Sequence, residues 1–127
     1  MEMIVTDIVL AAFIEGDQVL MARRGEHEKQ FPGHWDLIGG HVEAEEAVEA
    51  ALVREAEEEL GLTPTIFRDV GTFNDIGTVS FVRCDRMIDR PKLLGDEHSE
   101  LTWVRVSEAT FLHPLAHPKI MSAVSLV

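Results

Sequence analysis

The chain has 127 residues, a length typical of one domain, and we expect a single domain over residues 1–127. Its net charge of −12, from 11 basic and 23 acidic residues, argues against binding to duplex nucleic acid, which needs clustered Lys and Arg. Hydrophobic residues make up 46% of the chain, but no run is long enough to span a membrane, and the single cysteine, Cys84, excludes an internal disulfide. Residues 1–10 lack the basic cluster of a secretory signal, so we expect a cytoplasmic protein.

The first third of the chain predicts strands. Two apolar runs flank turn residues at Gly16 and predict a β-hairpin over residues 8–20, whose second strand continues through residues 19–25. A loop with proline and glycine breakers follows over residues 27–35. A short strand over residues 35–40 then ends at two glycines.

Next comes a predicted helix over residues 43–60, a stretch without Gly or Pro and rich in Ala, Glu and Leu. Gly61 is the expected helix stop. Apolar residues recur at every fourth position and form one stripe: Val48, Leu52, Ala56 and Leu60.

The second half returns mainly to strands. The elements expected there are strands over 64–74 and 77–84 joined by a turn at 75–77, a polar irregular segment over 85–100, a strand over 101–106, a short helix capped by Ser107, and a last helix within 117–127. Strands with one long central helix indicate a mixed α and β domain.

The central helix is unusually acidic, since eight glutamates fall between Glu43 and Glu59. At about 100° per residue, Glu59 falls within the apolar stripe, while Glu55 and Glu58 fall at its border and Glu57 falls on the far side. Carboxylates that face the body of a protein must be protonated or neutralised by cations. Oxygen ligands at this spacing suit Mg²⁺ or Mn²⁺, whereas a solvated acidic face is the alternative from the run alone.

The surroundings of this run follow a longer pattern. Gly40 is followed after five residues by Glu46, then after seven residues by Arg54, Glu55, Ala56, one residue, Glu58, Glu59, one residue, Gly61 and Leu62. This resembles the Nudix box of the Nudix (MutT-like) hydrolases, G-x5-E-x7-R-E-U-x-E-E-x-G-U with U apolar. The specified residue types would coincide by chance roughly once in 10⁸ starting positions.

The resemblance implies an α/β fold, the Nudix fold, which is an α/β/α sandwich with a mixed β-sheet and a loop–helix–loop Nudix box. It implies a hydrolase that cleaves a nucleoside diphosphate linked to another moiety, with Mg²⁺ or Mn²⁺ as cofactor. For a short single-domain chain we expect a (deoxy)nucleoside triphosphate converted to the monophosphate and pyrophosphate, by a monomer or homodimer. Alternatives are an ADP-ribose, ADP-sugar or dinucleoside polyphosphate hydrolase, and a Nudix-fold module that senses nucleotides without catalysis.

The resemblance also assigns roles by position. The expected metal ligands are the Gly40 carbonyl and the carboxylates of Glu55, Glu58 and Glu59, with a carboxylate from the later acidic loop, Glu97 or Glu100. One of these carboxylates acts as the base, and Glu97 is favoured over Glu100, which directly precedes a strand. Glu46 and Arg54 form the internal structural pair that orients the ligands. Gly61 closes the box as a structural residue.

Substrate residues are the least specified. Arg24, or Arg23, could pair with a phosphate or base, and a solvated strand-end charge is the alternative. His34 could contact phosphates, with a plain surface histidine as the alternative, and Trp35 could stack on a base. Gly39 would let the backbone approach the phosphates closely. Core packing is favoured for Trp103 and a plain strand position for Cys84. His98 and His117 show no metal-ligand spacing with a partner. Ile38 stands where relatives often have proline, so the approach to the box has a strand-like residue in place of a rigid one.

Overall fold

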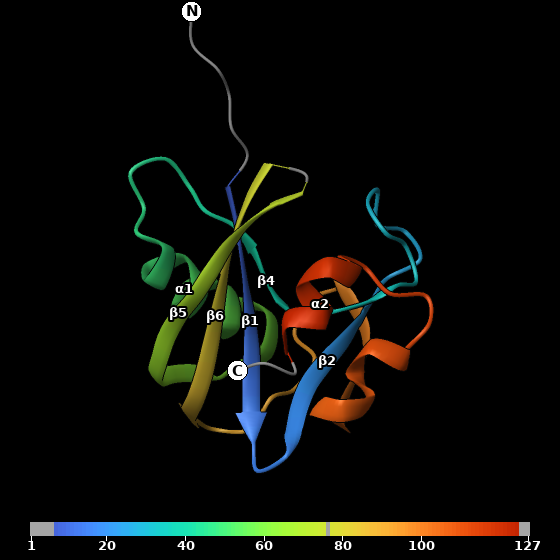
Figure 1. Cartoon of the computed structure of the whole chain (residues 1–127). Helices are drawn as coiled ribbons and strands as arrows, with labels where there is room; N and C mark the ends of the chain where they lie inside the picture. The colour runs from blue at the N-terminus through green and yellow to red at the C-terminus, as the bar shows by residue number, and fades with distance from the viewer. Residues whose placement is uncertain (1–6, 76, 125–127) are drawn as a thin grey trace, which may run out of the picture.

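The computed structural model describes residues 7–75 and 77–124, which form a sheet covered by helices (Figure 1). Its elements are β1 (Asp7–Glu15), β2 (Gln18–Arg24), β3 (Trp35–Asp36), β4 (Ile38–His41), α1 (Val48–Leu60), β5 (Thr63–Asp75), β6 (Gly77–Ile88), β7 (His98–Arg105), the 3₁₀ helix η1 (Val106–Phe111) and α2 (Pro118–Val124). Among the helices of this described part, none combines the length and apolar character needed to cross a membrane.

The sheet is mixed, with strand order β3-β2-β1-β6-β5 and with β4 paired to β1 and β7 paired to β2. Only the β1–β6 pair is parallel among the described pairs, and the others are antiparallel. β1 and β2 pair just at their hairpin end, where Ile14 faces Val19. Further along, β4 pairs with β1 while β3 pairs with β2, so β1 and β2 have different neighbours beyond the hairpin end.

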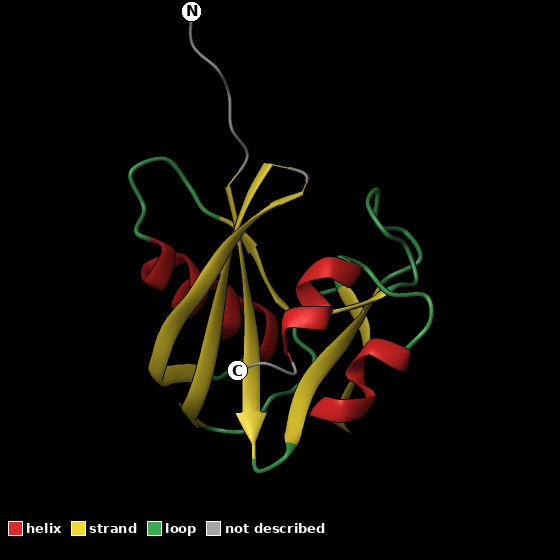
Figure 2. Ribbon diagram, viewed as in Figure 1, coloured by secondary structure: helices red, strands yellow, loops and turns green. Residues whose placement is uncertain are grey.

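Helices cover both faces of this sheet, with α1 behind it and α2 in front in Figure 2. β1 is buried from Ile8 to Ile14, and its side chains alternate between two hydrophobic clusters. One cluster holds Ile8 and Leu10 with α2, and the other holds Val9 and Phe13 with α1. This burial on both sides confirms the predicted sandwich with a mixed sheet.

The α1 helix begins at Val48, so the predicted start at Glu43 is wrong. Glu45 adopts a left-handed backbone (φ 64), which is incompatible with a continuous helix. The Glu46 carboxylate accepts a hydrogen bond from the backbone N–H of Glu43 and reaches toward Arg54, which closes residues 43–47 into a loop. Local side-chain bonds thus override the helix propensity of this Ala- and Glu-rich stretch.

Gly61 ends α1 as predicted, because its left-handed backbone (φ 66) returns its N–H to the carbonyls of the last turn. Ser107 does not cap the following short helix: the 3₁₀ helix η1 begins at Val106, without a side-chain cap. The predicted strand over 35–40 is split into β3 and β4.

The segment over 85–100 is shorter than predicted, since β6 extends to Ile88 and β7 begins at His98. The two long strands β5 and β6 pair as the predicted hairpin, although Ile76 in its turn lies outside the described residues. The last helix is α2, and the end of its predicted range, 125–127, also lies outside them. The burial of Cys84 in β6, which raises its thiol pKa to about 11, agrees with a plain strand residue.

Candidate active site and metal centre

The two glycines of β4, Gly39 and Gly40, each allow another group of the protein to come close to the backbone. A β-carbon at Gly39 would overlap the carbonyl oxygen of Val9, so this glycine is required by the pairing of β4 with β1. A β-carbon at Gly40 would lie 2.5 Å from the carboxyl carbon of Glu55. Gly40 therefore makes room for a carboxylate of α1. Ile38, which stands where relatives often have proline, is fully buried in the same strand.

The α1 helix separates its glutamates by face. Its buried stripe consists of Ala51, Leu52, Ala56 and Leu60, with Val48 only partly buried. Carboxylate oxygens of Glu55, Glu58 and Glu59 lie within 4.8 Å of one another. Glu57 is exposed and accepts a hydrogen bond from the Thr63 hydroxyl at 3.0 Å. Glu58 is exposed as well, with 58% of its side chain accessible, so the predicted inward orientation holds for Glu55 and Glu59 but not for Glu58, whose carboxylate joins theirs at the surface.

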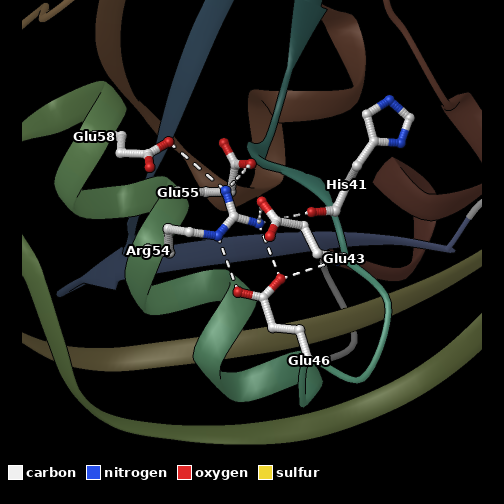
Figure 3. A network of polar contacts seen from close by, with 6 residues as sticks. All are labelled: His41, Glu43, Glu46, Arg54, Glu55 and Glu58. Atoms are coloured by element: carbon white, nitrogen blue, oxygen red, sulfur yellow. Dashed lines mark hydrogen bonds and ion pairs between the residues drawn. The ribbon is translucent and has the colours of Figure 1, made fainter.

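Arg54 lies at the centre of a polar network on the same side of the helix (Figure 3). Its Nε donates to Glu46 Oε2 at 2.9 Å and its Nη2 to Glu46 Oε1 at 3.0 Å, which is a two-pronged pair. The hydrogen bonds from Arg54 lower the pKa of the Glu46 carboxyl to about 2. Nη2 also donates to the carbonyl of His41 at 2.9 Å, which ties the glycine strand to the helix.

The same guanidinium orients the carboxylate of Glu55, the first of the predicted metal ligands. Arg54 Nη1 donates to Glu55 Oε1 at 2.9 Å and lies 3.6 Å from Glu58 Oε2. Burial raises the pKa of Glu55, and the hydrogen bond from Arg54 opposes that effect. Arg54 therefore holds a half-buried carboxylate in one orientation beside Gly40.

A second group of ligand atoms shares Glu59 and adds residues from the other side of the site. Ligand atoms of Glu59, Glu97 and His98 lie within 4.8 Å of one another. Burial, the hydrogen bond with Glu97 and the nearby carboxylates raise the pKa of Glu59 to about 8. Glu100 instead pairs with Arg23 at 3.6 Å, and its side chain is half exposed.

Three residues that the sequence did not predict lie in or beside the site: His98, His117 and Asp36. His98 is buried, which lowers its pKa, and it lies in the carboxylate group just described. Asp36 and His117 are buried together, with His117 Nε2 3.8 Å from Asp36 Oδ2. Burial raises the pKa of Asp36 to about 6. Because these residues meet only through tertiary packing, their spacing in the sequence carries no signal, although an acid within the apolar run of residues 35–38 is unusual.

A cavity of about 180 Å³ opens beside the carboxylates. Its lining includes Gly39, Gly40, Glu97, His98, Arg24, Asp36, Phe31 and His117. A larger hollow of about 420 Å³ lies elsewhere, around Arg86 and Trp103, and shares no residue with the carboxylate groups. We take the smaller cavity as the candidate substrate site because Glu97 and His98 of one carboxylate group line it together with Gly40, which lies against Glu55.

The predicted substrate residues are only partly brought together. Arg24 lines the cavity and lies 3.9 Å from Glu97, and it also pairs with Glu28 at 3.2 Å. His34 is absent from the cavity lining and its Nδ1 contacts the Pro32 carbonyl at 2.9 Å. Trp35 packs against the hydrophobic cluster on the α2 side, and the partly buried Trp103 packs against the other one.

The donor set fits a divalent cation. The four carboxylates form two groups that share Glu59, and Gly40 lies against Glu55. Hard oxygen donors are the ligands that Mg²⁺ and Mn²⁺ prefer. Repulsion among like charges at this distance favours either a bound proton or a cation. The residues present therefore suit the metal that the resemblance implies, with Glu55, Glu58, Glu59 and Glu97 as the carboxylates able to hold it.

Comparison with known proteins points in one direction. The family model described as the NUDIX domain matches residues 5–124. Over 112 residues, the chain is 36% identical to the CTP pyrophosphohydrolase of Escherichia coli (strain K12), covering 85% of this chain and 82% of that protein. Over 104 residues, it is 35% identical to the nucleoside triphosphatase NudI of Salmonella arizonae, covering 70% of this chain and 74% of that protein.

A solved structure agrees with these sequence matches. The crystal structure of a MutT NUDIX hydrolase from Burkholderia pseudomallei superposes with a TM-score of 0.84 at 24% identity. The match covers 96% of this chain and 97% of that one, so it extends over the sheet and both helical layers. At this identity the likeness bears on the fold.

Proposed function

From the premise that this chain belongs to the NUDIX family and is a hydrolase of phosphoanhydride bonds in nucleotides, we propose a Mg²⁺-dependent nucleoside triphosphate pyrophosphohydrolase. The products are the nucleoside monophosphate and pyrophosphate, and Mn²⁺ is the alternative cofactor. The whole chain, 1–127, acts as one catalytic domain in the cytoplasm. The family membership confirms the resemblance that the sequence pattern indicated.

One observation carries the proposal: two groups of potential ligand atoms share Glu59 and together hold four carboxylates, and Arg54 orients the first of these, that of Glu55. Glu55 and Glu59 are half-buried, so their charges are costly without a counter-charge. A triphosphate is itself strongly negative and this chain carries −12, so the two attract each other only across bound cations. The same groups that repel each other in the free protein thus become the site for a cation and its phosphate.

The chemistry follows from these groups. A bound divalent cation supplies charge shielding of the phosphate oxygens and lowers the pKa of a coordinated water. A carboxylate accepts the proton of the attacking water, for which Glu55, Glu58 and Glu97 are the candidates. The water oxygen forms a bond to phosphorus while the bridging P–O bond breaks, and the leaving group, which is pyrophosphate or the nucleotide, departs with that electron pair. Arg54 and Glu46 hold the carboxylates in orientation and do not touch the phosphate.

The cavity beside the carboxylates then holds the rest of the nucleotide. Arg24 on its wall pairs with phosphate or base, because its planar fork suits both. Gly39 and Gly40 let the backbone come close to the phosphates. CTP is a natural first substrate to test, since one relative is named a CTP pyrophosphohydrolase.

The test is hydrolysis of a nucleotide panel with Mg²⁺, comparing wild type, Glu58→Gln and the matched control Glu57→Gln. The panel contains ribo- and deoxynucleoside triphosphates, ADP-ribose and a dinucleoside polyphosphate. We expect release of monophosphate and pyrophosphate from a triphosphate by wild type and Glu57→Gln, and loss of that activity in Glu58→Gln. Nucleotide binding without turnover of any panel member, with Mg²⁺ or Mn²⁺, would instead identify a sensing module.

A further inference from the structure

The segment between β6 and β7 crosses the C-terminal end of α1 on its way to the active site. The backbone N–H of Lys92 donates to the carbonyl of Leu60 at 3.0 Å, and that of Leu94 donates to the carbonyl of Glu59 at 3.0 Å. Carbonyls in the last turn of a helix have no partner within the helix. The segment therefore binds to the end of α1 through groups that the helix leaves available.

A side-chain contact reinforces these hydrogen bonds. Leu94 lies over Gly61, and its Cδ1 is 3.1 Å from the position that a β-carbon on Gly61 would occupy. The nearest atoms to that position belong to Leu94 and Lys92, and the adjacent Leu93 contributes none of them. Gly61 thus has two roles: its left-handed backbone ends the helix, and its lack of a side chain leaves space in which Leu94 packs.

This contact is close to the metal centre along the chain. Glu97 is three residues after Leu94, a distance of at most about 10 Å when fully extended. The carbonyl of Glu97 accepts a hydrogen bond from the N–H of Gly25 at 2.9 Å, which fixes the segment at its other end. Glu59 belongs to both contacts, since its carbonyl binds Leu94 and its carboxyl hydrogen-bonds Glu97.

We propose that residues 92–97 act as a clip that sets the position of Glu97 against Glu59, so that Leu94 and Gly61 are positioning residues for the divalent cation. This inference rests on the proposed function, in which Glu59 and Glu97 bind the cation. The clip touches neither the cation nor the nucleotide and acts only through Glu97. Shortening Leu94 therefore weakens cation binding without removing any ligand.

The test is a Mn²⁺ titration followed by electron paramagnetic resonance, with no nucleotide present, on Leu94→Ala and the matched control Leu93→Ala. Both leucines are exposed to a similar degree, 39% and 43%, so the two changes remove similar surface. We expect Leu94→Ala to weaken Mn²⁺ binding about fivefold, the effect of losing part of one apolar contact, and Leu93→Ala to leave it unchanged. Leu94→Met, which keeps the apolar bulk, restores wild-type binding.

A double-mutant cycle separates positioning from a general loss of stability. In a Glu97→Gln background, Leu94→Ala should have no further effect on Mn²⁺ binding, because the clip acts through Glu97. An equal loss in both backgrounds, or equal losses for Leu93→Ala and Leu94→Ala, overturns the clip. Should Leu94→Ala fail to fold, as seen by thermal unfolding, Leu94→Val gives the same comparison with a smaller truncation.

Glu59→Gln distinguishes the failure of the clip from the failure of the proposed function. If Glu59→Gln weakens Mn²⁺ binding while Leu94→Ala leaves it unchanged, the cation site stands and only the clip is wrong. If Glu59→Gln also leaves Mn²⁺ binding unchanged, the proposed cation site is wrong, and the proposed clip is then wrong as well.

Discussion

Glu46 and Glu59 lie near opposite ends of the same Nudix box, yet their carboxyl groups have opposite properties. The hydrogen bonds from Arg54 lower the pKa of Glu46 to about 2. Burial and the neighbouring Glu97, Glu55 and Glu58 raise the pKa of Glu59 to about 8. The first carboxylate already has its cation within the protein, and the second requires a proton or a cation from outside.

This difference divides the box into two parts: the ion pair of Glu46 with Arg54, which we call the brace, and a proposed cation-binding site around Glu59. A carboxylate satisfied by Arg54 is poorly suited to bind a metal, because its lone pairs are engaged and its charge is neutralised. A carboxylate crowded by like charges gains most from a divalent cation. The motif thus combines two uses of glutamate in one helix and its preceding loop, and variants at each position should have separable effects.

The largest effect is expected when the crowded carboxylate is lost. Glu59→Gln removes the carboxylate shared by both groups of atoms that could hold the proposed cation, so kcat/KM should fall by more than about 100-fold. The measurement is pyrophosphate release at saturating Mg²⁺, with a Mg²⁺ titration for affinity. Activity within tenfold of wild type would show that Glu59 is not a ligand.

A smaller effect is expected when the brace is weakened. Arg54→Lys keeps the positive charge but loses the two-pronged pair with Glu46 and cannot also reach Glu55 in the same geometry. We expect kcat/KM to fall by roughly 10- to 100-fold, as for other residues that orient metal ligands. Carboxyl titration by NMR should show the pKa of Glu46 rising toward its ordinary value.

The outcome that contradicts the brace is an Arg54→Lys enzyme with wild-type kcat/KM and an unchanged Glu46 pKa. Glu46→Gln is the complementary variant, since it removes the other half of the pair. If the pair acts as a unit, the double variant should lose about as much activity as either single one.

Local features of the box were predictable from the sequence because they depend on residues close together in the chain. Helical geometry alone places Glu57 away from Glu55 and Glu59, and a glycine after a helix-forming run predicts the stop at Gly61. The pairing of Glu46 with Arg54 follows from the family pattern and is present in the structure. The helix start failed because a helix-forming composition cannot reveal that Glu46 bonds back to the loop.

Residues that reach the site from distant parts of the chain could not be predicted in this way. His98 enters because β7 pairs with β2, which places it opposite Arg24, and neither strand carries a signal of that register. His117 reaches Asp36 because the chain before α2 returns to β3, where Leu115 bridges Trp35. A spacing argument finds ligands on one element, whereas a partner on another element depends on the completed sheet.

Asp36 differs from both glutamates, because burial is the main cause of its raised pKa. Because burial raises the pKa of Asp36 from 3.8 to about 6, the folded protein keeps a proton that the unfolded chain releases between these values. The contribution of this proton to the free energy of unfolding is fully present below about pH 4 and is lost as the pH rises through about 6. In the wild type, the free energy of unfolding measured in urea should fall by roughly 1–3 kcal/mol between pH 4 and pH 6.5 because of this carboxyl. In Asp36→Asn this fall should be absent. An equally steep decline in the variant would show that Asp36 is not its source.

The smallest effect is expected at the glutamate that faces neither Arg54 nor the cation. Glu57 is exposed and contacts Thr63, so Glu57→Gln keeps a hydrogen-bond acceptor and removes only a solvated charge. We expect kcat/KM within about twofold of wild type and a change in unfolding free energy within about 0.5 kcal/mol. Glu57 is the neighbour of Glu58 and two residues from Glu59, so Glu57→Gln removes negative charge close to the carboxylate cluster and tests whether total charge alone matters. Comparable losses for Glu57→Gln and Glu59→Gln would mean that activity follows total negative charge, and the separation of roles within the helix would fail.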